Sequence, residues 1–312
     1  MNTNKKLDIQ MKRVMVVMSA YNGSKYITQQ LDSIFQQKDV DVTCYVRNDG
    51  STDNTLEVLN NLTPLSATHL IIDDGDNVGW EKSFLLALRA APEADYYAFA
   101  DQDDIWFDDK LISAVRLLEQ NAKDGVPMMV HCNKLSVGED LKPFAHQVRR
   151  TPRPLNRQNA MVQEYAQGCA IVMNEAARQL VTEHIPKSKI AHDFWCGLLC
   201  YLFGEVLYDN TPRFYHISHG SNASGEGHTL SSWKNRLKLF FKHGNIYYAP
   251  YEDLMEGYGD RLTADDKQFL KKIKTYRRDI GAKFSLLFSP RFIRDSILGT
   301  LSLKAAILFN KL

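Results

Sequence analysis

Short apolar segments alternate with helical patterns through the first hundred residues, and this alternation constrains the fold more than any other feature. The strand-like runs are Val14–Met18, Val42–Val46, His69–Ile72 and Tyr96–Ala100. Between them, apolar residues recur at helical spacing, as in the stretch from Ile27 to Phe35. Strands that alternate with helices favour a mostly parallel sheet covered on both faces, so the predicted fold class is α/β.

The later sequence predicts further strands, a loop and a helical tail. Pro127–His131 and Gly168–Met173 have the composition of strands, and a helix is expected to begin near His192. The segment 142–157 contains three prolines and predicts a loop or lid. From about Ser231 to the end, the pattern is helical and basic.

Charge is distributed unevenly along the chain. Lys and Arg outnumber Asp and Glu by 16 to 8 in residues 229–312, whereas residues 1–228 hold 22 against 29. An acidic body is not typical of a nucleic-acid groove, so no nucleic-acid partner is expected. A basic tail that also contains apolar residues favours an anionic membrane surface, with solvated surface charge as the alternative.

Cysteine usage and the amino terminus bear on the compartment. The five cysteines are dispersed among apolar segments, without the spacing of a zinc site or of a disulfide scaffold. The first ten residues lack the apolar core of a signal peptide, and no stretch reaches about 18 uninterrupted apolar residues. We therefore expect a cytoplasmic protein whose membrane contact, where there is one, is peripheral.

Three carboxylates lie within four residues directly after the run Tyr96–Ala100. They belong to the sequence Asp101-Gln102-Asp103-Asp104. Ligands of open parallel sheets bind at the carboxyl ends of the strands, and hard divalent cations take oxygen ligands. The segment therefore predicts a metal site that neutralises a diphosphate leaving group, with a solvated acidic turn or helix cap as the alternative.

Two other polar turns follow strand-like runs. Asn48–Asp53 combines a carboxylate, a glycine and hydroxyl groups, and taken alone it favours a helix N-cap over a base-binding site. Asn77–Gly79 is, by itself, an ordinary turn signal.

Taken together and in this order, the motifs resemble those of family 2 glycosyltransferases. They are Ser19-Ala-Tyr-Asn-Gly23, Asn48-Asp-Gly-Ser-Thr-Asp53, Asn77-Val-Gly79 and Ala100-Asp-Gln-Asp-Asp-Ile-Trp106. The resemblance covers roughly residues 12–225 and implies a GT-A fold, a nucleotide-diphosphate-sugar donor, a divalent metal (Mg²⁺ or Mn²⁺) and inversion at the anomeric carbon. The pattern is most similar to bacterial rhamnosyltransferases of cell-wall and O-antigen polysaccharide assembly.

The resemblance also implies roles for individual residues. Donor contacts are expected from five residues: Ala20 and Tyr21 along the nucleotide, Asp49 on the pyrimidine base, and Asp101 and Gln102 in the acidic motif. The expected metal ligands are Asp101, Asp103 and His219, with His216 as a weaker rival to His219.

An inverting transfer needs a general base for the acceptor hydroxyl, and Asp193 is the candidate. It opens a predicted helix in His192-Asp193-Phe194-Trp195, and similar family members carry a carboxylate here. A helix cap is the alternative role. Gly168-Cys169-Ala170 either flanks the acceptor or packs in the core, and Trp106 either stacks on a sugar or packs.

We therefore predict a flexible amino terminus (1–11), a GT-A catalytic domain (12–228) and a helical extension (229–312). The extension includes the basic, apolar segments Trp233–Lys242 and Phe292–Phe309, which are expected to contact either a membrane surface or another subunit of a homo-oligomer.

The predicted reaction moves a sugar, by analogy L-rhamnose from dTDP-rhamnose, to a saccharide acceptor on a lipid carrier at the inner face of the cytoplasmic membrane. Two other functions fit the same carboxylates. One is a metal-dependent nucleotide-sugar hydrolase or nucleotidyltransferase, and the other is a non-catalytic nucleotide-binding module.

Overall fold

The computed structural model describes residues 11–62, 69–145, 147, 153–219 and 249–312. The predicted tail segment Trp233–Lys242, the expected helix start near Ser231 and the boundary between residues 228 and 229 lie outside the described residues.

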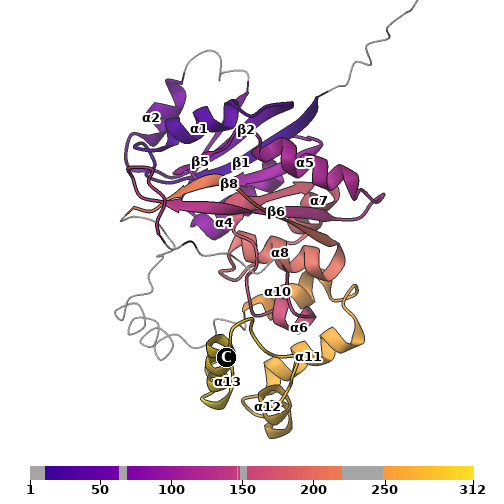
Figure 1. The fold of residues 1–312 in the computed structure, drawn as a ribbon. Helices are drawn as coiled ribbons and strands as arrows, with labels where there is room; N and C mark the ends of the chain where they lie inside the picture. The colour runs from indigo at the N-terminus through magenta and orange to yellow at the C-terminus, as the bar shows by residue number, and fades with distance from the viewer. Residues whose placement is uncertain (1–10, 63–68, 146, 148–152, 220–248) are drawn as a thin grey trace, which may run out of the picture.

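One eight-stranded sheet runs through the described chain, in the order β3-β2-β1-β4-β7-β6-β8-β5 (Figure 1). Pairing is parallel for β1 with β2 and β4, for β2 with β3, and for β6 with β8, while β7 and β5 pair antiparallel with their neighbours. The strands are β1 Lys12–Ala20, β2 Val40–Asp49, β3 Leu70–Gly75, β4 Tyr96–Ala100, β5 Asp104–Trp106, β6 Met128–Val137, β7 Ile171–Asn174 and β8 Glu205–Ile217.

Helices cover both faces of the sheet, as the sequence predicts. Along β1, Val14, Val16 and Met18 pack in one core cluster with residues of α1 and α5, while Met15 and Val17 pack in a second cluster with residues of α4 and α8. This is the two-residue alternation of a strand buried on both sides. The helices concerned are α1 Ile27–Phe35, α2 Thr55–Asn60, α4 Trp80–Ala90, α5 Lys110–Gln120, α7 Glu175–Glu183 and α8 His192–Phe203.

Three local features differ from the sequence-based expectation. Residues Gly168–Ala170 form a 3₁₀ turn, so the predicted strand over Gly168–Met173 is wrong in its first half. The turn presents the carbonyl of Cys169 to the buried ammonium of Lys110, at 2.7 Å. Strands β5 and β8 were not predicted, because β5 is very short and β8 is interrupted by the polar bulge around Pro212.

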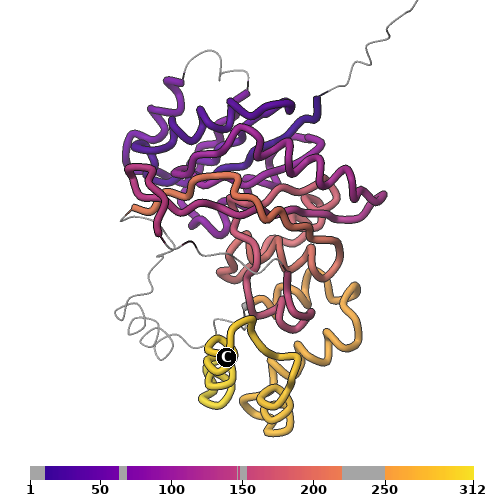
Figure 2. Tube along the Cα trace, in the orientation of Figure 1, coloured from indigo at the N-terminus to yellow at the C-terminus, as the bar shows by residue number. Residues whose placement is uncertain are grey.

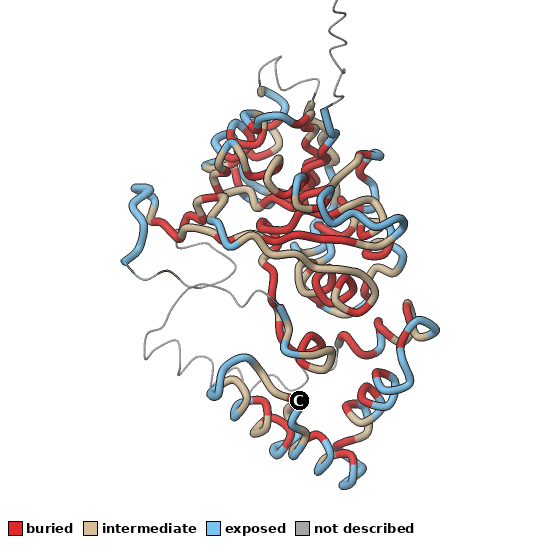
Figure 3. The backbone as a smooth tube through the Cα atoms, turned by 45° about the vertical axis from the view of Figure 1, so that its right-hand side comes forward, coloured by how far each residue is buried: buried red, intermediate tan, exposed pale blue. Residues whose placement is uncertain are grey.

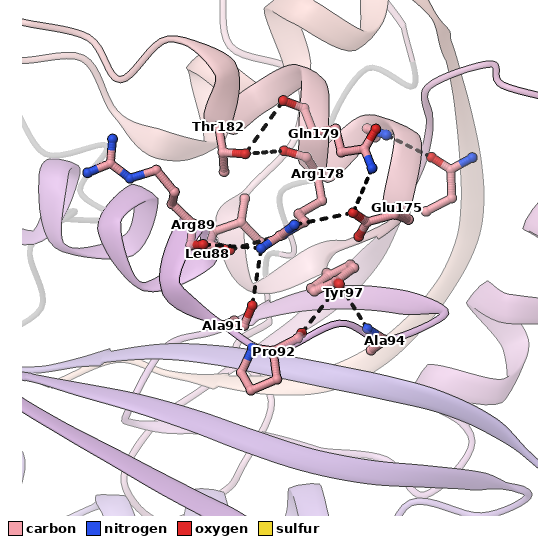
Figure 4. Close-up of polar contacts among 12 residues, drawn as sticks. Leu88, Arg89, Ala91, Pro92, Ala94, Tyr97, Glu175, Arg178, Gln179 and Thr182 are labelled. Carbon is pink, nitrogen blue, oxygen red and sulfur yellow. Dashed lines mark hydrogen bonds and ion pairs between the residues drawn. The ribbon is translucent and has the colours of Figure 1, made fainter.

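A single arginine joins α7 to the end of α4 (Figure 4). The guanidinium of Arg178 donates hydrogen bonds to the carbonyls of Leu88, Arg89 and Ala91, at 3.3, 3.1 and 3.1 Å. These carbonyls lie in the last turn of α4 and at its C-cap, Ala91, where carbonyl groups lack N–H donors within the helix. Arg178 thereby fixes α4, whose other end faces the candidate site.

The C-terminal helices lie at the end of the molecule away from α2 (Figures 1 and 2). Their buried residues form one continuous cluster with those of α7 and α8, and the ring of Trp195 in α8 lies 5.8 Å from that of Tyr258 in α10. Figure 3 shows buried residues at intervals along these helices. The C-terminal helices are α10 Ala249–Tyr258, α11 Ala264–Thr275, α12 Ile280–Leu287 and α13 Ile297–Leu308, and the short helix α6 Arg157–Ala160 contacts α8 and α11.

An ion pair fixes α11 against the rest of the protein. Arg157 donates to the carboxylate of Asp266 through Nε at 3.1 Å and through its terminal nitrogen at 2.7 Å, and it also donates to the carbonyl of Leu202 in α8. Asp266, whose side chain is 5% exposed, also completes a capping box with Thr263 at the start of α11.

Replacing Arg157 with alanine is expected to lower the free energy of unfolding by about 2 kcal/mol, because it leaves a mostly buried carboxylate without its cation. Urea denaturation of the full chain measures this. Arg261→Ala is the matched control, since Arg261 pairs with Glu183 at the surface and its loss should cost less than about 1 kcal/mol. Equal losses in the two variants would contradict the structural role of Arg157.

Candidate active site

A cleft of about 380 Å³ opens at the carboxyl ends of β1, β2 and β4. Such an edge is where open α/β sheets bind ligands. Six of the predicted site residues line it together with His216, the weaker rival to His219; the six are Tyr21, Asp49, Asp101, Gln102, Asp103 and Asp193. Two others lie outside the lining: Ala20 is fully buried at the end of β1, and His219 contacts Asp103 of the acidic segment.

The acidic segment after β4 forms two carboxylate–imidazole pairs. Oδ2 of Asp103 lies 2.7 Å from Nε2 of His219, and Oδ1 of Asp104 lies 2.9 Å from Nδ1 of His216. Burial, together with the negative charges of Asp104 and Asp103, raises the pKa of Asp101 to about 7. Burial and Asp104 also raise the pKa of Asp103, although His219 opposes this.

These residues fit a divalent cation in charge and in ligand type. Burial first, and then the charges of Asp104 and Asp103, raise the pKa of Asp101, and Oδ2 of Asp104 is buried without a hydrogen-bond partner among the described residues. Carboxylate oxygens with an imidazole nearby are suitable ligands for Mg²⁺ or Mn²⁺.

The tightest group of potential ligands in the described chain is a different one. Asp104, Cys169 and His216 have ligand atoms within 4.8 Å of one another, a spacing that Asp101, Asp103 and His219 do not reach in the part of the chain described. Burial lowers the pKa of His216, but its hydrogen bond to Asp104 and that carboxylate's charge outweigh burial and raise it. His216 therefore acts as the counter-charge of Asp104.

A buried lysine lies beneath the acidic segment. The Nζ atom of Lys110 is 3.1 Å from the ring centroid of Trp106 and donates to the carbonyl of Cys169. Burial lowers the pKa of Lys110 to about 8. Trp106 is itself buried under this ammonium, so its contact with Lys110 favours core packing over sugar stacking.

The loop after β1 is held by the acidic segment. The backbone N–H of Tyr21 donates to Oε1 of Gln102 at 2.9 Å, and Nε2 of Gln102 donates back to the carbonyl of Tyr21 at 3.1 Å. A Cβ atom at Gly23 would lie 2.2 Å from the same Oε1, so a larger residue here would displace the Gln102 side chain from this position. Gln102 thus fixes the backbone that presents the exposed ring of Tyr21.

Asp49 joins two of the sequence motifs. Its carboxylate, buried and paired with Arg47, accepts hydrogen bonds from the backbone N–H groups of Val78 at 3.1 Å and Gly79 at 3.0 Å. Gly79 has φ of 87°, a conformation that favours glycine. Each carboxylate oxygen can accept more than one hydrogen bond, so Asp49 keeps acceptor capacity toward the cleft it lines.

Asp193 lies in the first turn of α8, and Ala191 occupies the N-cap position. Oδ1 of Asp193 accepts from the N–H of Phe194 at 2.7 Å, and Oδ2 accepts from the N–H of Gly168 at 3.1 Å. The 3₁₀ turn therefore helps to orient the carboxylate, which also lies at the positive end of the α8 helix dipole.

Residues 15–181 match the model of glycosyl transferase family 2, which is more than half of the 312-residue chain. The chain belongs to glycosyl transferase family 2. The family and the enzyme class predicted from the four motifs are confirmed.

Curated relatives of this glycosyltransferase match over different lengths. The dTDP-rhamnosyl transferase RfbG of Shigella flexneri is 37% identical over 108 residues, which are 33% of this chain and 37% of the relative. An uncharacterized glycosyltransferase of Nostoc sp. is 28% identical over 274 residues, or 85% of this chain and 83% of that protein. The chain thus spans little more than a third of the rhamnosyl transferase that it matches.

Solved structures share the fold of this glycosyltransferase. S. aureus TarS 1–349 in complex with UDP-GlcNAc gives a TM-score of 0.57 at 16% identity, covering 89% of this chain and 76% of that one. The mannosyltransferase PcManGT of Pyrobaculum calidifontis, in complex with GDP-Man and Mn²⁺, gives 0.51 at 16% identity, covering 97% and 89%. The predicted GT-A fold is confirmed.

Sequence reasoning did not single out five residues that line the cleft of this glycosyltransferase, namely Trp80, Phe84, Glu164, Gln167 and Ala191, whereas the lining residues Ser19 and Asn77 belong to the sequence motifs. His192 was noted only as the neighbour of Asp193. Its ring stacks on Phe84 at 3.9 Å, and neither ring nitrogen has a hydrogen-bond partner among the described residues. The pairing of His192 with Asp193 was a usable signal, whereas Glu164 and Gln167 lie in a segment without a recognisable pattern.

Burial lowers the pKa of His192 from 6.5 to about 3, so this residue is expected to make the glycosyltransferase acid-sensitive. The unfolded chain binds a proton at His192 below about pH 6.5 and the folded chain does not, so stability falls as the pH drops through this window by up to about 1.4 kcal/mol per unit. Urea unfolding measures the free energy of unfolding at pH 7 and at pH 4.5. Between these two values, His192→Phe should lose about 2 kcal/mol less stability than the wild type. His192→Gln is the second variant, and unchanged pH dependence in both would contradict the assignment.

Proposed function

We propose that this family 2 glycosyltransferase passes a sugar from a nucleotide-diphosphate donor to a saccharide acceptor, with inversion at the anomeric carbon. One observation supports this most: the carboxylate of Asp193 and the acidic pair Asp101 and Asp103 line the same cleft. A single displacement requires a base and a site for the departing diphosphate around one anomeric carbon.

The nucleotide is proposed to bind along the loop after β1. Asp49, held by Arg47 and by the 77–79 loop, would accept a hydrogen bond from the N–H of a pyrimidine base. The ring of Tyr21 would lie along the nucleotide, over the backbone that continues from buried Ala20. Gln102 would contribute by fixing the backbone of Tyr21.

Asp101 and Asp103 are the residues proposed to hold Mg²⁺ or Mn²⁺, with His219 beside Asp103. When bound, such an ion would neutralise charge on the diphosphate leaving group. The two aspartates supply oxygen ligands, and the Asp104–His216 pair keeps β5 in place beside β8 beneath them.

Asp193 is proposed as the general base. Its carboxylate would take the proton of the acceptor hydroxyl as that oxygen attacks the anomeric carbon from the side opposite the diphosphate. The N–H groups of Gly168 and Phe194 hold the two carboxylate oxygens in fixed directions.

L-Rhamnose from dTDP-rhamnose is the proposed sugar, supported by the partial similarity to the rhamnosyl transferase RfbG. The acceptor is proposed to be a saccharide on a lipid carrier at the cytoplasmic face of the membrane, in bacterial surface polysaccharide synthesis. Complexes of similar folds with UDP-GlcNAc and GDP-Man support a nucleotide-sugar donor in general.

Asp193→Asn is expected to reduce sugar transfer at least a hundredfold, roughly the contribution of a general base, while donor binding remains. Chromatography of products from dTDP-rhamnose and other nucleotide sugars, with and without saccharide acceptors, measures transfer. Full transfer activity in the purified variant would overturn the role of Asp193. Free sugar or sugar phosphate as the sole product, in the presence of acceptors, would favour a hydrolase.

Asp103→Ala is expected to weaken donor binding where Mn²⁺ is present and to have little effect in EDTA. Thermal shift with a panel of nucleotide sugars measures this, because a ligand that binds the native state raises the melting temperature. Asp108→Asn is the control, since Asp108 lies in the same segment but pairs with Lys38 at the surface. Equal metal-dependent shifts in wild type and Asp103→Ala would contradict the proposed metal site.

A further inference from the structure

Large apolar side chains are exposed along one side of two neighbouring C-terminal helices. On α12, Ile280, Phe284 and Phe288 follow one another at intervals of four residues, and the rings of Phe284 and Phe288 stack at 5.9 Å. Ile297 is 81% exposed and Phe288 73%. We call this set the apolar face; its members are Ile280, Phe284, Phe288, Ile297, Leu298, Leu301, Leu308 and Phe309.

Two lysines hold α12 and α13 together as a hairpin. Lys283 of α12 donates to the carbonyl of Leu308 at 2.9 Å, and Lys304 of α13 donates to the carbonyl of Leu286 at 2.7 Å. The start of α12 therefore lies at the end of α13. Because Lys283 adjoins Phe284, the exposed residues of both helices are brought close to one another.

The inner side of α13 is also apolar. Leu303, Ala306 and Ile307 are buried in the same core cluster as Leu286 of α12. Helices that are apolar on both their inner and outer sides are typically buried on both sides by other protein segments or by lipid. An exposed patch with this many large apolar side chains is uncommon in a soluble monomer and marks an interaction surface.

The charge around the apolar face favours an anionic partner. Residues 276–312 contain seven Lys or Arg and two Asp. Arg278 lies two residues before Ile280, Arg291 lies between the two helices, and both are exposed. In a twofold dimer built on this face, the same cations of two copies would approach one another, which is unfavourable. Lipid head groups of negative charge would instead be attracted to them.

Helix length decides how such a surface would meet a bilayer. The helices α12 and α13 have 8 and 12 residues, and a helix that spans a bilayer needs about 20. Among the described residues, no helix has the length and apolar character required to cross a membrane. The arrangement instead suits helices that lie in the plane of the interface, with apolar side chains inserted and cations at the head groups.

We propose that the apolar face of α12 and α13 docks this protein on an anionic lipid bilayer. Docking at this face needs neither donor nor acceptor, so its failure would leave the proposed sugar transfer untouched. It would hold the glycosyltransferase at the surface where a lipid-linked acceptor is found.

Co-sedimentation of the full chain with vesicles tests this. We expect binding to phosphatidylcholine vesicles with about one third phosphatidylglycerol, and binding at least about fivefold weaker to pure phosphatidylcholine, as for a surface that uses several cations. The variant pair Phe288→Ser with Leu301→Ser should weaken binding at least about tenfold, because both side chains leave the lipid. The pair Arg278→Ser with Arg291→Ser should weaken binding to the anionic vesicles by about the same factor.

Phe144→Ser with Leu155→Ser is the matched control, since both side chains are exposed elsewhere, by 42% and 53%. It should bind vesicles as the wild type does, and thermal melts of all variants confirm that each is folded. Wild type that stays in the supernatant would overturn the proposal, as would an equal loss in the control pair. A concentration-dependent dimer abolished by Phe288→Ser with Leu301→Ser, without vesicle binding, would assign the face to a second copy instead.

Discussion

Three carboxylates brought together between β4 and β5 are the constraint on which the rest of the site depends. Their mutual repulsion and burial raise the pKa of Asp101, and the surrounding fold supplies positive or proton-donating groups in response. His216 comes from β8, His219 follows that strand, and Lys110 opens α5. The late strand β8 is therefore required for the acidic segment, although it lies far from that segment in the sequence.

The motifs at the strand ends also hold one another in place. Asp49 from the second motif bonds the backbone of Gly79 in the third, and Gln102 from the fourth bonds the backbone of Tyr21 in the first. These contacts give a physical reason for the motifs to occur together. Each loop is shaped by a side chain from the next strand of the sheet, so a ligand meets a site that is already formed.

The sequence was sufficient for the parts of the fold that are local. Strands β1 to β4 and the helices between them follow from alternating patterns, and the polar residues that end those strands do line one cleft. Strand β5, the 3₁₀ turn at Gly168 and the contribution of Glu164 were missed because long-range contacts determine them. The exposure of Phe288 and Ile297 likewise depends on how α12 and α13 meet, which no local pattern records.

Lys110 lies under both halves of the candidate site. Its ammonium donates a hydrogen bond to the carbonyl of Cys169, and the residue before it, Gly168, donates to Asp193. The same ammonium lies against the ring of Trp106, the last residue of the strand that begins at Asp104. The carboxylate of Asp193 and the acidic segment are thus both linked to one buried cation. Their separation is consequently a property of the protein interior, and a change in how α5 packs would alter it without touching any group that meets a ligand.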